Sequence, residues 1–377
     1  MRHILYTIGS LDNPGGVERV LVNKANFLVQ KFKITILVAQ KNKSDFAYSI
    51  SPSVNILVLD INKYDNGWTK IPILGFFYKI KKLKKIYQNI MNQIKPDIVI
   101  NVERGFEDFI LPKLNPHIPC IRESHSSLQA SGLMDHYNKS IKGKFFTYLY
   151  NQQLKKFDKL VLLTEEDRKF RNYKNGDVVI PNVVSKFEIE PNYDLNAKEV
   201  ISVGRLDQFK NFKDQILVWK NIIKTHPNWK LKIYGEGPEK KSLSSLIKTL
   251  ELESHVFLMG RSNHIEKELK NSAFFLFTSM AEGFGMVLVE AMQMGLPVIS
   301  YNCPCGPKDI ITDNEDGFLV RLNDRDELQL KILELIEKPH LRKTMSSYAI
   351  EKSKRYNEGT IMPRWIELFD KIINKYG

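Results

Sequence analysis

The sequence predicts an α/β protein built from two tandem Rossmann-like domains. Short apolar runs alternate with helical stretches along both halves of the chain, a pattern typical of parallel sheets covered by helices. The length of 377 residues exceeds one ordinary hydrophobic core and favours two domains of about 150–200 residues each. A polar stretch without clear periodicity, residues 183–198, separates the two series and is predicted to be a linker.

The first predicted domain covers residues 1–182. A glycine-rich loop follows its first strand, and a helical pattern then runs to about Gln30. The GxGxxG fingerprint of dinucleotide-binding proteins is absent from this loop. The predicted strands are Ile4–Ile8, Ile34–Ala39, Asn55–Leu59, Asp97–Asn101, Cys120–Glu123, Lys159–Thr164 and Val178–Ile180.

The second predicted domain covers residues 199–355. A last helical segment, 356–377, carries apolar residues on about one face and could pack back on the first domain. Two such domains would leave a cleft between the carboxyl ends of their sheets, where ligands of these folds bind. The predicted strands lie near residues 200–204, 231–234, 256–259, 273–278 and 297–301.

Composition and charge narrow the class of protein. With 43% hydrophobic and 26% charged residues, the chain has the composition of a folded globular protein. The sequence has neither an apolar run of about 18 residues nor the pattern of a signal peptide, so we expect a cytoplasmic location. Three cysteines make no disulfide framework, and Cys303 and Cys305 are too close for a usual metal pair. About 12 of the 13 net positive charges fall in residues 1–182, which suggests an anionic partner.

The most informative stretch is SMAEGFGMVLVEAMQMGLPVIS, residues 279–300. It follows a buried apolar run and places Glu282 in a turn and Glu290 in the helix behind it. Gly283 and Gly285 lie at the turn, where the backbone passes close to another group or takes unusual dihedral angles. A strand, a loop of small residues and a helix in this order are typical of sites that bind anions and sugars.

Three further motifs of the second half end predicted strands. SVGRLDQFKNF places Gly204, Arg205 and Lys210 beyond a strand end, where two cations could bind a diphosphate. The alternative for both cations is an ordinary solvated surface. Glu236 in IYGEGPE and Arg261 in FLMGR lie in turns that are unremarkable when each is taken alone.

In this context the sequence resembles the retaining glycosyltransferases of family 4, which have the GT-B fold. The EX7E motif of that family is matched by Glu282 and Glu290, and its GRLxxxK element by Gly204, Arg205, Leu206 and Lys210. YGEGP and FLMGR occur in the expected order. The resemblance is strong in the second domain and extends to the first only through GGVE and the strand pattern.

The resemblance implies a nucleotide-sugar donor and assigns roles to the motif residues. Arg205 and Lys210 would bind the diphosphate, Glu290 the ribose hydroxyls, and Glu282 the transferred sugar, with retention of the anomeric configuration. The remaining donor-binding positions predicted are Gly15, Gly16, Gly204, Glu236, Arg261, Gly283, Phe284, Gly285, Met286 and Val287.

The catalytic group predicted is Glu282, Arg205, Lys210 and His125. His125 follows a strand of the first domain, where the family often has a histidine near the acceptor and the donor sugar. Glu103 and Arg104 follow the preceding strand and are predicted, with His125, to line the acceptor pocket. The alternative for His125 is an ordinary structural or exposed histidine. No cofactor and no metal are expected.

Alternative interpretations remain for several motifs and for the function. The pair Asp324 and Asp326 matches the DxD pattern of metal-dependent sugar transferases, but Asp324 fits better as a helix N-cap. The basic segments FFYKIKKLKKIYQNI and KSIKGKFFTYLY fit either surface helices or contacts with an anionic membrane. The acceptor would then be a glycan or a lipid-linked glycan in surface polysaccharide synthesis. Alternatives are a nucleotide-sugar epimerase or phosphorylase of the same fold, and a nucleic-acid-binding protein, although no RRM, KH or zinc-finger signature is present.

Overall fold

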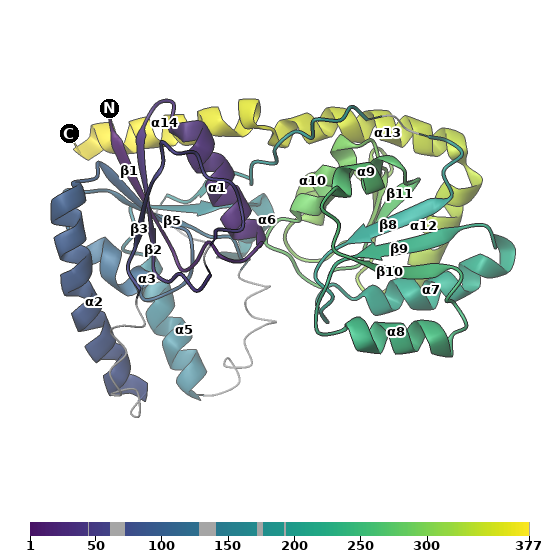
Figure 1. The fold of residues 1–377 in the computed structure, drawn as a ribbon, viewed down its shortest axis with the longest axis horizontal. Coiled ribbons are helices and arrows are strands. Elements are labelled where there is room, and N and C mark those ends of the chain that lie inside the picture. Colours follow the sequence, from purple (N-terminus) through teal and green to yellow (C-terminus); the bar gives the residue numbers. More distant parts are fainter. Residues whose placement is uncertain (44, 61–71, 128–140, 172–175, 192–193, 377) are drawn as a thin grey trace. The chain divides into compact units, whose positions relative to one another are not determined.

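The computed structural model describes the chain except residues 44, 61–71, 128–140, 172–175, 192–193 and 377. Two compact units result, each with its own parallel sheet (Figure 1). The first comprises residues 1–126, 131–183 and 358–377, and the second residues 184–357 with 127–130. The cleft expected between the two sheets stays a prediction.

The first unit has a doubly wound sheet in the order β3-β2-β1-β4-β5-β6-β7, counted over the described residues. Its strands are β1 (His3–Ile8), β2 (Lys33–Val38), β3 (Asn55–Val58), β4 (Ile98–Asn101), β5 (Cys120–Glu123), β6 (Lys159–Leu162) and β7 (Val178–Val179). Its helices are α1 (Gly16–Leu28), α2 (Pro72–Ile94), α3 (Glu107–Ile110), α5 (Ile141–Leu154), α6 (Glu165–Arg171) and α14 (Glu358–Tyr376).

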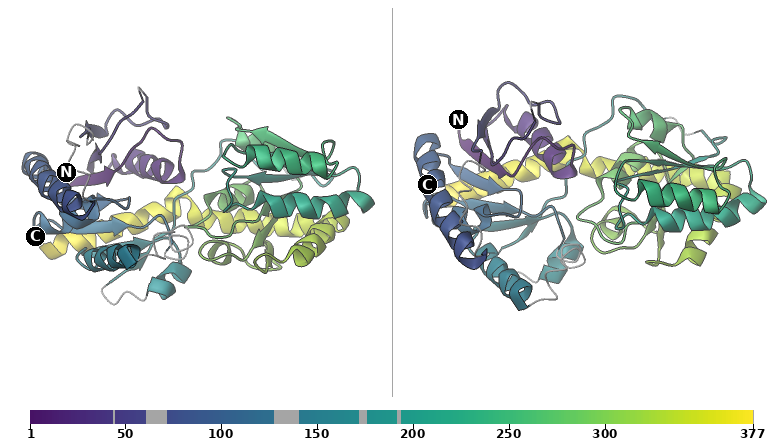
Figure 2. Two further views of the ribbon diagram at one scale, coloured as in Figure 1. Left: turned by 90° about the horizontal axis from the view of Figure 1, so that it is seen from below. Right: turned by 60° about the horizontal axis from the view of Figure 1, so that its bottom comes forward.

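Side-chain alternation along the strands creates two cores in this unit. Ile4, Tyr6 and Ile8 of β1 pack with α1 and α14, whereas Leu5 packs on the opposite face with α2, α3 and α5. Successive residues of a strand point to opposite faces, so a strand buried on both sides is apolar throughout. The last helix, yellow in both views of Figure 2, therefore completes the core of the first unit although it follows the second in sequence.

The second unit repeats the plan with the strand order β10-β9-β8-β11-β12-β13 over the described residues. Its strands are β8 (Glu199–Val203), β9 (Lys230–Tyr234), β10 (Val256–Gly260), β11 (Phe274–Phe277), β12 (Val298–Tyr301) and β13 (Gly317–Val320). Its helices are α7 (Phe212–Thr225), α8 (Lys240–Thr249), α9 (Ile265–Lys270), α10 (Met286–Gln293), α11 (Pro307–Ile310), α12 (Arg325–Glu337) and α13 (Pro339–Ser353).

The α/β class and the two Rossmann-like units are confirmed, and the predicted strands occur within one or two residues of their expected ends. One strand was missed: β13 is a four-residue edge strand with a short apolar run that follows a polar turn. Residues 184–198, most of the predicted linker, group with the second unit.

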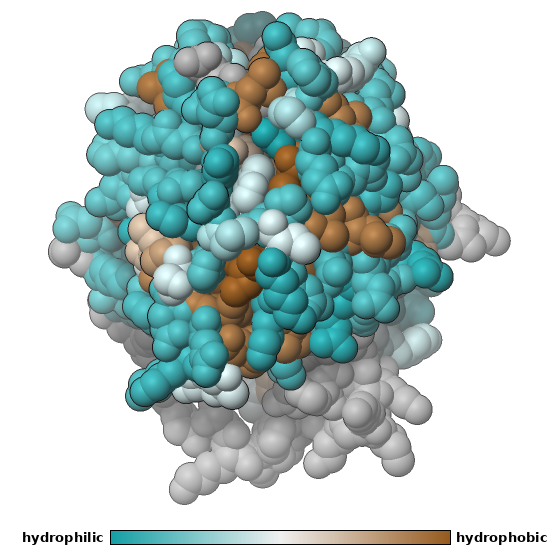
Figure 3. All heavy atoms as spheres, turned by 90° about the vertical axis from the view of Figure 1, so that its right-hand side faces the viewer, coloured by the Kyte–Doolittle hydropathy of each residue, from teal (hydrophilic) through white to brown (hydrophobic). Residues whose placement is uncertain are grey.

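One face of the molecule shows how polar and apolar side chains are distributed on the surface. The face in Figure 3 is mainly hydrophilic, with hydrophobic side chains in small separate patches. Among the helices that the structure describes, none combines the length and apolarity needed to cross a membrane. The three cysteines are buried free thiols.

Candidate active site

The strand order predicts one ligand-binding position in each sheet. In a doubly wound sheet the connections change direction beside the first strand, and ligands bind at the carboxyl ends of the two strands that meet there. In the second unit these strands are β8 and β11, which pair directly. In the first unit they are β1 and β4. Most predicted site residues lie in the loops after these four strands.

The loops after β8 and β11 are joined by several hydrogen bonds. Met280 N donates to Phe209 O at 2.7 Å, and Thr278 Oγ1 donates to the carbonyls of Lys210 and Asn211 at 3.0 Å each. The Thr278 hydroxyl also accepts from Gln215 Nε2 at 2.9 Å within a buried cluster. These bonds hold two segments, about 70 residues apart in sequence, in a fixed relation.

The central contact of this site is an ion pair between Lys210 Nζ and Glu282 Oε1. The Lys210 side chain is 24% exposed and that of Glu282 is 12% exposed, so both reach solvent from a largely buried position. The ammonium also lies 5.3 Å from the centre of the Phe277 ring. The structure thus brings the residue predicted to bind the diphosphate into contact with the residue predicted to bind the sugar.

The turn after Glu282 depends on two glycines. Gly285 has φ +94 at the N-cap of α10, and a Cβ there would lie 3.0 Å from Leu288 Cδ1. Gly306 comes so close that a Cβ would lie 2.2 Å from Phe284 O. Side-chain-bearing residues rarely adopt such a φ, which explains glycine at position 285. The turn leads directly into α10, whose first amides lie at a helix N-terminus.

The other predicted donor residues differ in exposure. Glu290 is 6% exposed on α10, whereas Arg205 is 73% exposed, with its Nε 3.8 Å from Asp207 Oδ2. Glu236 pairs with Lys240 at 2.8 Å on the surface. Arg261 is also exposed. Lys210 and Glu282 are therefore brought into contact, while Arg205, Glu236 and Arg261 extend towards water.

The YGEGP turn packs on the GRL segment, backbone against backbone. A Cβ on Gly235, which has φ +148, would lie 1.8 Å from Gly204 O. A Cβ on Gly237 would lie 2.3 Å from Leu206 O. Leu206 N donates to Glu236 O at 3.0 Å, which fixes the two turns together. These glycines thus support the loop that carries Arg205 and Lys210.

In the first unit, Glu103 bridges the loops after β1 and β4, because its Oε2 accepts from Gly9 N at 2.7 Å. Gly15 is the N-cap of α1, and a Cβ there would lie 2.2 Å from Glu18 Oε2. Burial raises the pKa of Glu18, and the nearby Glu103 adds to the effect. Arg104 stacks over the Tyr150 ring at 4.3 Å.

His125 lies just beyond β5 beside a buried charge pair. Its side chain is 6% exposed, and its Nε2 lies 3.2 Å from Glu123 Oε1. Neither ring nitrogen makes a well-aligned hydrogen bond among the described residues. Glu123 also pairs with Lys24, and both side chains are 1% exposed. The Lys24 ammonium lies 4.1 Å from the centre of the Trp365 ring.

Charge pairing outweighs burial at Glu123. Burial alone would raise its pKa, but Lys24 and His125 lower the pKa to about 2. The carboxylate beside His125 is therefore ionised at neutral pH. A lysine on the apolar face of α1 gave no sign of this partner in the sequence, because Lys24 and Glu123 are 99 residues apart.

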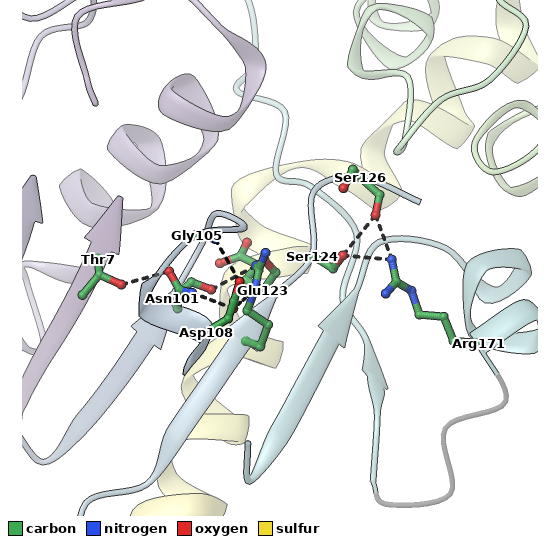
Figure 4. A network of polar contacts seen from close by, with 9 residues as sticks. Thr7, Asn101, Gly105, Asp108, Glu123, Ser124, Ser126 and Arg171 are labelled. Carbon is green, nitrogen blue, oxygen red and sulfur yellow. Dashed lines mark hydrogen bonds and ion pairs between the residues drawn. The ribbon is translucent and has the colours of Figure 1, made fainter. Parts of the chain in front are cut away.

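A second polar network, which the sequence did not indicate, runs across β1, β4 and β5 (Figure 4). Thr7 donates to Asn101 at 3.0 Å, Asn101 donates to Asp108 at 2.8 Å, and Arg122 donates to Asp108 at 2.7 Å. Asp108 also accepts from Gly105 N at 3.0 Å. The network fixes the loop that carries Glu103 and Arg104.

The described ranges contain no group of three or more His, Cys, Asp and Glu side chains placed to hold a metal ion. Asp324 Oδ1 accepts from Glu327 N at 2.9 Å and caps α12, which confirms the N-cap interpretation of the DxD pair.

Comparison with known proteins shows which proteins this chain is similar to. Residues 185–352 match the family described as Glycosyl transferases group 1. An "Uncharacterized glycosyltransferase" of Haemophilus influenzae (strain ATCC 51907 / DSM 11121 / KW20 / Rd) is 28% identical over 372 residues, covering 97% of this chain and 99% of that protein.

Two further proteins to which the chain is similar are also sugar transferases by name or by fold. A Campylobacter jejuni relative, a GalNAc-alpha-(1->4)-GalNAc-alpha-(1->3)-diNAcBac-PP-undecaprenol alpha-1,4-N-acetyl-D-galactosaminyltransferase, is 25% identical over 99% of this chain and 100% of its own length. A solved S. aureus TarM mutant in complex with Fondaparinux, alpha-GlcNAc-glycerol and UDP has a TM-score of 0.77 at 18% identity, covering 98% of this chain and 100% of that one. The fold is that of the GT-B glycosyltransferases.

Proposed function

We propose that this chain, whose residues 185–352 match the glycosyl transferases group 1 family, moves a hexose or N-acetylhexosamine from a nucleotide sugar to a glycan or lipid-linked acceptor. The observation that carries the proposal is the contact between Lys210 and Glu282 where β8 and β11 end. The contact joins a cation and a carboxylate in the loops after β8 and β11, and the loop that carries Glu282 leads into α10. We therefore expect a sugar diphosphate to meet both side chains and the first amides of α10.

In the proposed reaction, the bond from C1 of the donor sugar to the diphosphate oxygen breaks, and its electron pair stays on the phosphate. Lys210 and Arg205 stabilise that charge as fixed cations. Glu290 binds the ribose hydroxyls, while Glu282 and the amides of residues 284–286 bind the hydroxyls of the sugar. An acceptor hydroxyl forms the new bond on the face that the phosphate leaves, and the phosphate takes its proton. The configuration at C1 is then retained.

The proposed donor is a UDP-sugar and the proposed acceptor a lipid-linked glycan of a surface polysaccharide. UDP appears in the description of the S. aureus complex, and an undecaprenol-linked acceptor in the name of the C. jejuni relative. In the first unit, His125, Glu103 and Arg104 are assigned to the acceptor side, and Gly15 and Gly16 to close approach of the donor phosphates.

The experiment is product analysis by mass spectrometry with a panel of UDP-, GDP- and ADP-sugars and with undecaprenyl-linked acceptors. Transfer that depends on Glu290 supports the proposal. Release of an altered free nucleotide sugar without acceptor would identify an epimerase instead. Phosphate-dependent release of a sugar phosphate would identify a phosphorylase, and salt-sensitive binding to generic DNA or RNA a nucleic-acid-binding protein.

We also propose that the protein acts at the cytoplasmic face of an anionic membrane and that helix α2 contacts the lipid headgroups. Phe77 and Tyr78 are 54% and 51% exposed, and the lysines at 81, 84 and 85 are exposed behind them on the same helix. Exposed aromatic and basic residues on one helix fit a lipid interface. The second basic segment lies partly outside the described residues.

Sedimentation with phosphatidylglycerol vesicles, against phosphatidylcholine vesicles, tests this placement. A variant with Lys81, Lys84 and Lys85 changed to Gln should lose binding. A matched variant with the exposed Lys213, Lys220 and Lys241 changed to Gln should keep it. Equal binding of both variants to anionic vesicles would exclude α2 as the contact.

A further inference from the structure

The loop that carries His125 is held by an arginine from another element. Arg171 Nη2 donates to Ser124 Oγ at 3.1 Å and to Ser126 O at 2.9 Å (Figure 4). One guanidinium nitrogen therefore binds the residues before and after His125 in the sequence. Ser124 Oγ itself donates to Ser126 O at 3.0 Å. We call Arg171, Ser124 and Ser126 the Arg171 clamp.

The clamp is anchored in the interior of the first unit. Arg171 Nε donates to Asp167 Oδ2 at 2.8 Å, and the two side chains are 8% and 3% exposed. The backbone N of Asp167 donates to the hydroxyl of Thr164, a buried residue just past β6. Ser124 N donates to Val161 O at 2.9 Å within the sheet. The guanidinium therefore joins the end of β6 and helix α6 to the loop after β5.

The orientation of the His125 imidazole depends on this loop and on Glu123. The ring is buried, and its Nε2 lies 3.2 Å from Glu123 Oε1, but neither nitrogen makes a well-aligned hydrogen bond among the described residues. Glu123 acts on one end of the ring, and the backbone on either side of His125, which the clamp holds, fixes where the ring is attached. Nδ1 has no hydrogen-bond partner among the described residues, and a buried polar atom of this kind is usually explained by a role with a ligand.

We propose that Arg171 is a positioning residue that holds the His125 imidazole in the orientation needed for the proposed transfer. It acts through Ser124 and Ser126 and touches no substrate. The inference rests on the proposed function, because it assigns His125 to the acceptor side of the reaction. A planar guanidinium can serve Asp167 and two loop oxygens at once, and a lysine ammonium lacks that geometry.

The test compares Arg171→Lys with Arg168→Lys. Both variants keep a positive charge on α6, but Arg168 is 47% exposed and pairs with Glu165 at 3.4 Å and Asp177 at 3.5 Å, away from the loop. Ser124→Ala is a second variant that removes part of the clamp and leaves the Arg171–Asp167 pair in place. Thermal unfolding establishes that each variant is folded.

The first measurement is the imidazole ¹H–¹⁵N spectrum of histidine-labelled protein, with the His125 signals assigned by their loss in His125→Gln. We expect Arg171→Lys and Ser124→Ala to shift or broaden the His125 signals and to leave those of the other seven histidines in place. Arg168→Lys should leave all eight unchanged. Unaltered His125 signals in both clamp variants would overturn the inference, whether or not the protein transfers sugar.

The second measurement is a double-mutant cycle on kcat. Arg171→Lys should lower kcat by about tenfold or more, because small displacements of a reacting group cost about this much or more. In a His125→Gln background the same change should cost almost nothing, since its effect passes through His125. Equal losses in both backgrounds would show that Arg171 acts elsewhere. If the wild type transfers no sugar from the panel, the proposed function fails and the spectra alone decide the role of Arg171.

Discussion

The Lys210→Ala variant tests whether Lys210 serves catalysis or mainly stabilises the fold. In the wild type its ammonium pairs with Glu282 at a position where the two side chains are 24% and 12% exposed. Glu282 keeps access to water in the variant, so the free energy of unfolding should fall by only about 1 kcal/mol. For a domain of 150–250 residues, that lowers Tm by about 2–4 °C.

The effect on catalysis should be much larger. If Lys210 stabilises the charge on the departing diphosphate, its loss should lower kcat by about 10²–10³-fold, as removal of one preorganised electrostatic group commonly does. A contribution of this size follows from the partly buried position, where a charge is screened less than in bulk water. Lys220→Ala, an exposed lysine on α7, should leave both kcat and Tm unchanged.

The assay measures UDP release and acceptor glycosylation at saturating donor, with Tm measured on the same samples. Circular dichroism of both variants controls for folding. A folded Lys210→Ala protein that keeps more than half of the wild-type kcat would refute the assignment. A Tm loss far above 4 °C would instead mean that the ion pair mainly stabilises the fold.

The remaining predictions concern single groups. Glu290→Gln should weaken UDP binding, measured by calorimetry, about tenfold, which corresponds to about 1.4 kcal/mol. Glu282→Gln should bind UDP normally and lose affinity only for the UDP-sugar. An equal loss of UDP binding in both variants would contradict the separate roles. Because the pKa of Glu123 is lowered to about 2 in the folded state, its contribution to stability is present above the unfolded pKa of about 4.5 and is lost as the pH falls towards 2. Urea unfolding at pH 5 and pH 3 should show a larger drop for the wild type than for the neutral Lys24→Met/Glu123→Gln double variant, and equal drops would exclude the buried pair as the cause. Asp324→Ala should lower the urea midpoint of unfolding through loss of the α12 cap, and an unchanged midpoint would contradict the capping role. EDTA should leave transfer unchanged; EDTA-sensitive transfer that is restored by Mn²⁺ would reopen a metal role.

Helix α2 has two exposed aromatic side chains that its sequence pattern did not predict. Its sequence predicts a helix with lysines around an apolar stripe, and the structure buries Leu83 and Tyr87 while Phe77 and Tyr78 stay exposed. A helix packed in the usual way turns its large aromatic residues inwards. The exposed aromatics are therefore the feature that periodicity alone could not indicate.

The sequence by itself determined the described strands except β13, and the residue types of the candidate site, because these follow from local patterns. The turn before α10 is an example: Gly285, one of the two glycines predicted to take unusual dihedral angles there, has a positive φ. The Asp324 cap is another, since its hydrogen bond reaches only three residues ahead. Such features depend on neighbours in the chain, which a single sequence displays directly.

Only the tertiary structure decided which of these residues meet. Lys210 and Glu282 form a pair because β8 and β11 are neighbours in the sheet. Arg171 and Ser124 meet across 47 residues because β6, which precedes α6, is the neighbour of β5, and Lys24 and Glu123 meet across 99 residues because the helix α1 packs on the sheet. Each partner taken alone is an ordinary charged or polar residue. The energy of an ion pair or hydrogen bond depends on distance and burial, and both are set by strand order, which a local pattern in the sequence does not encode.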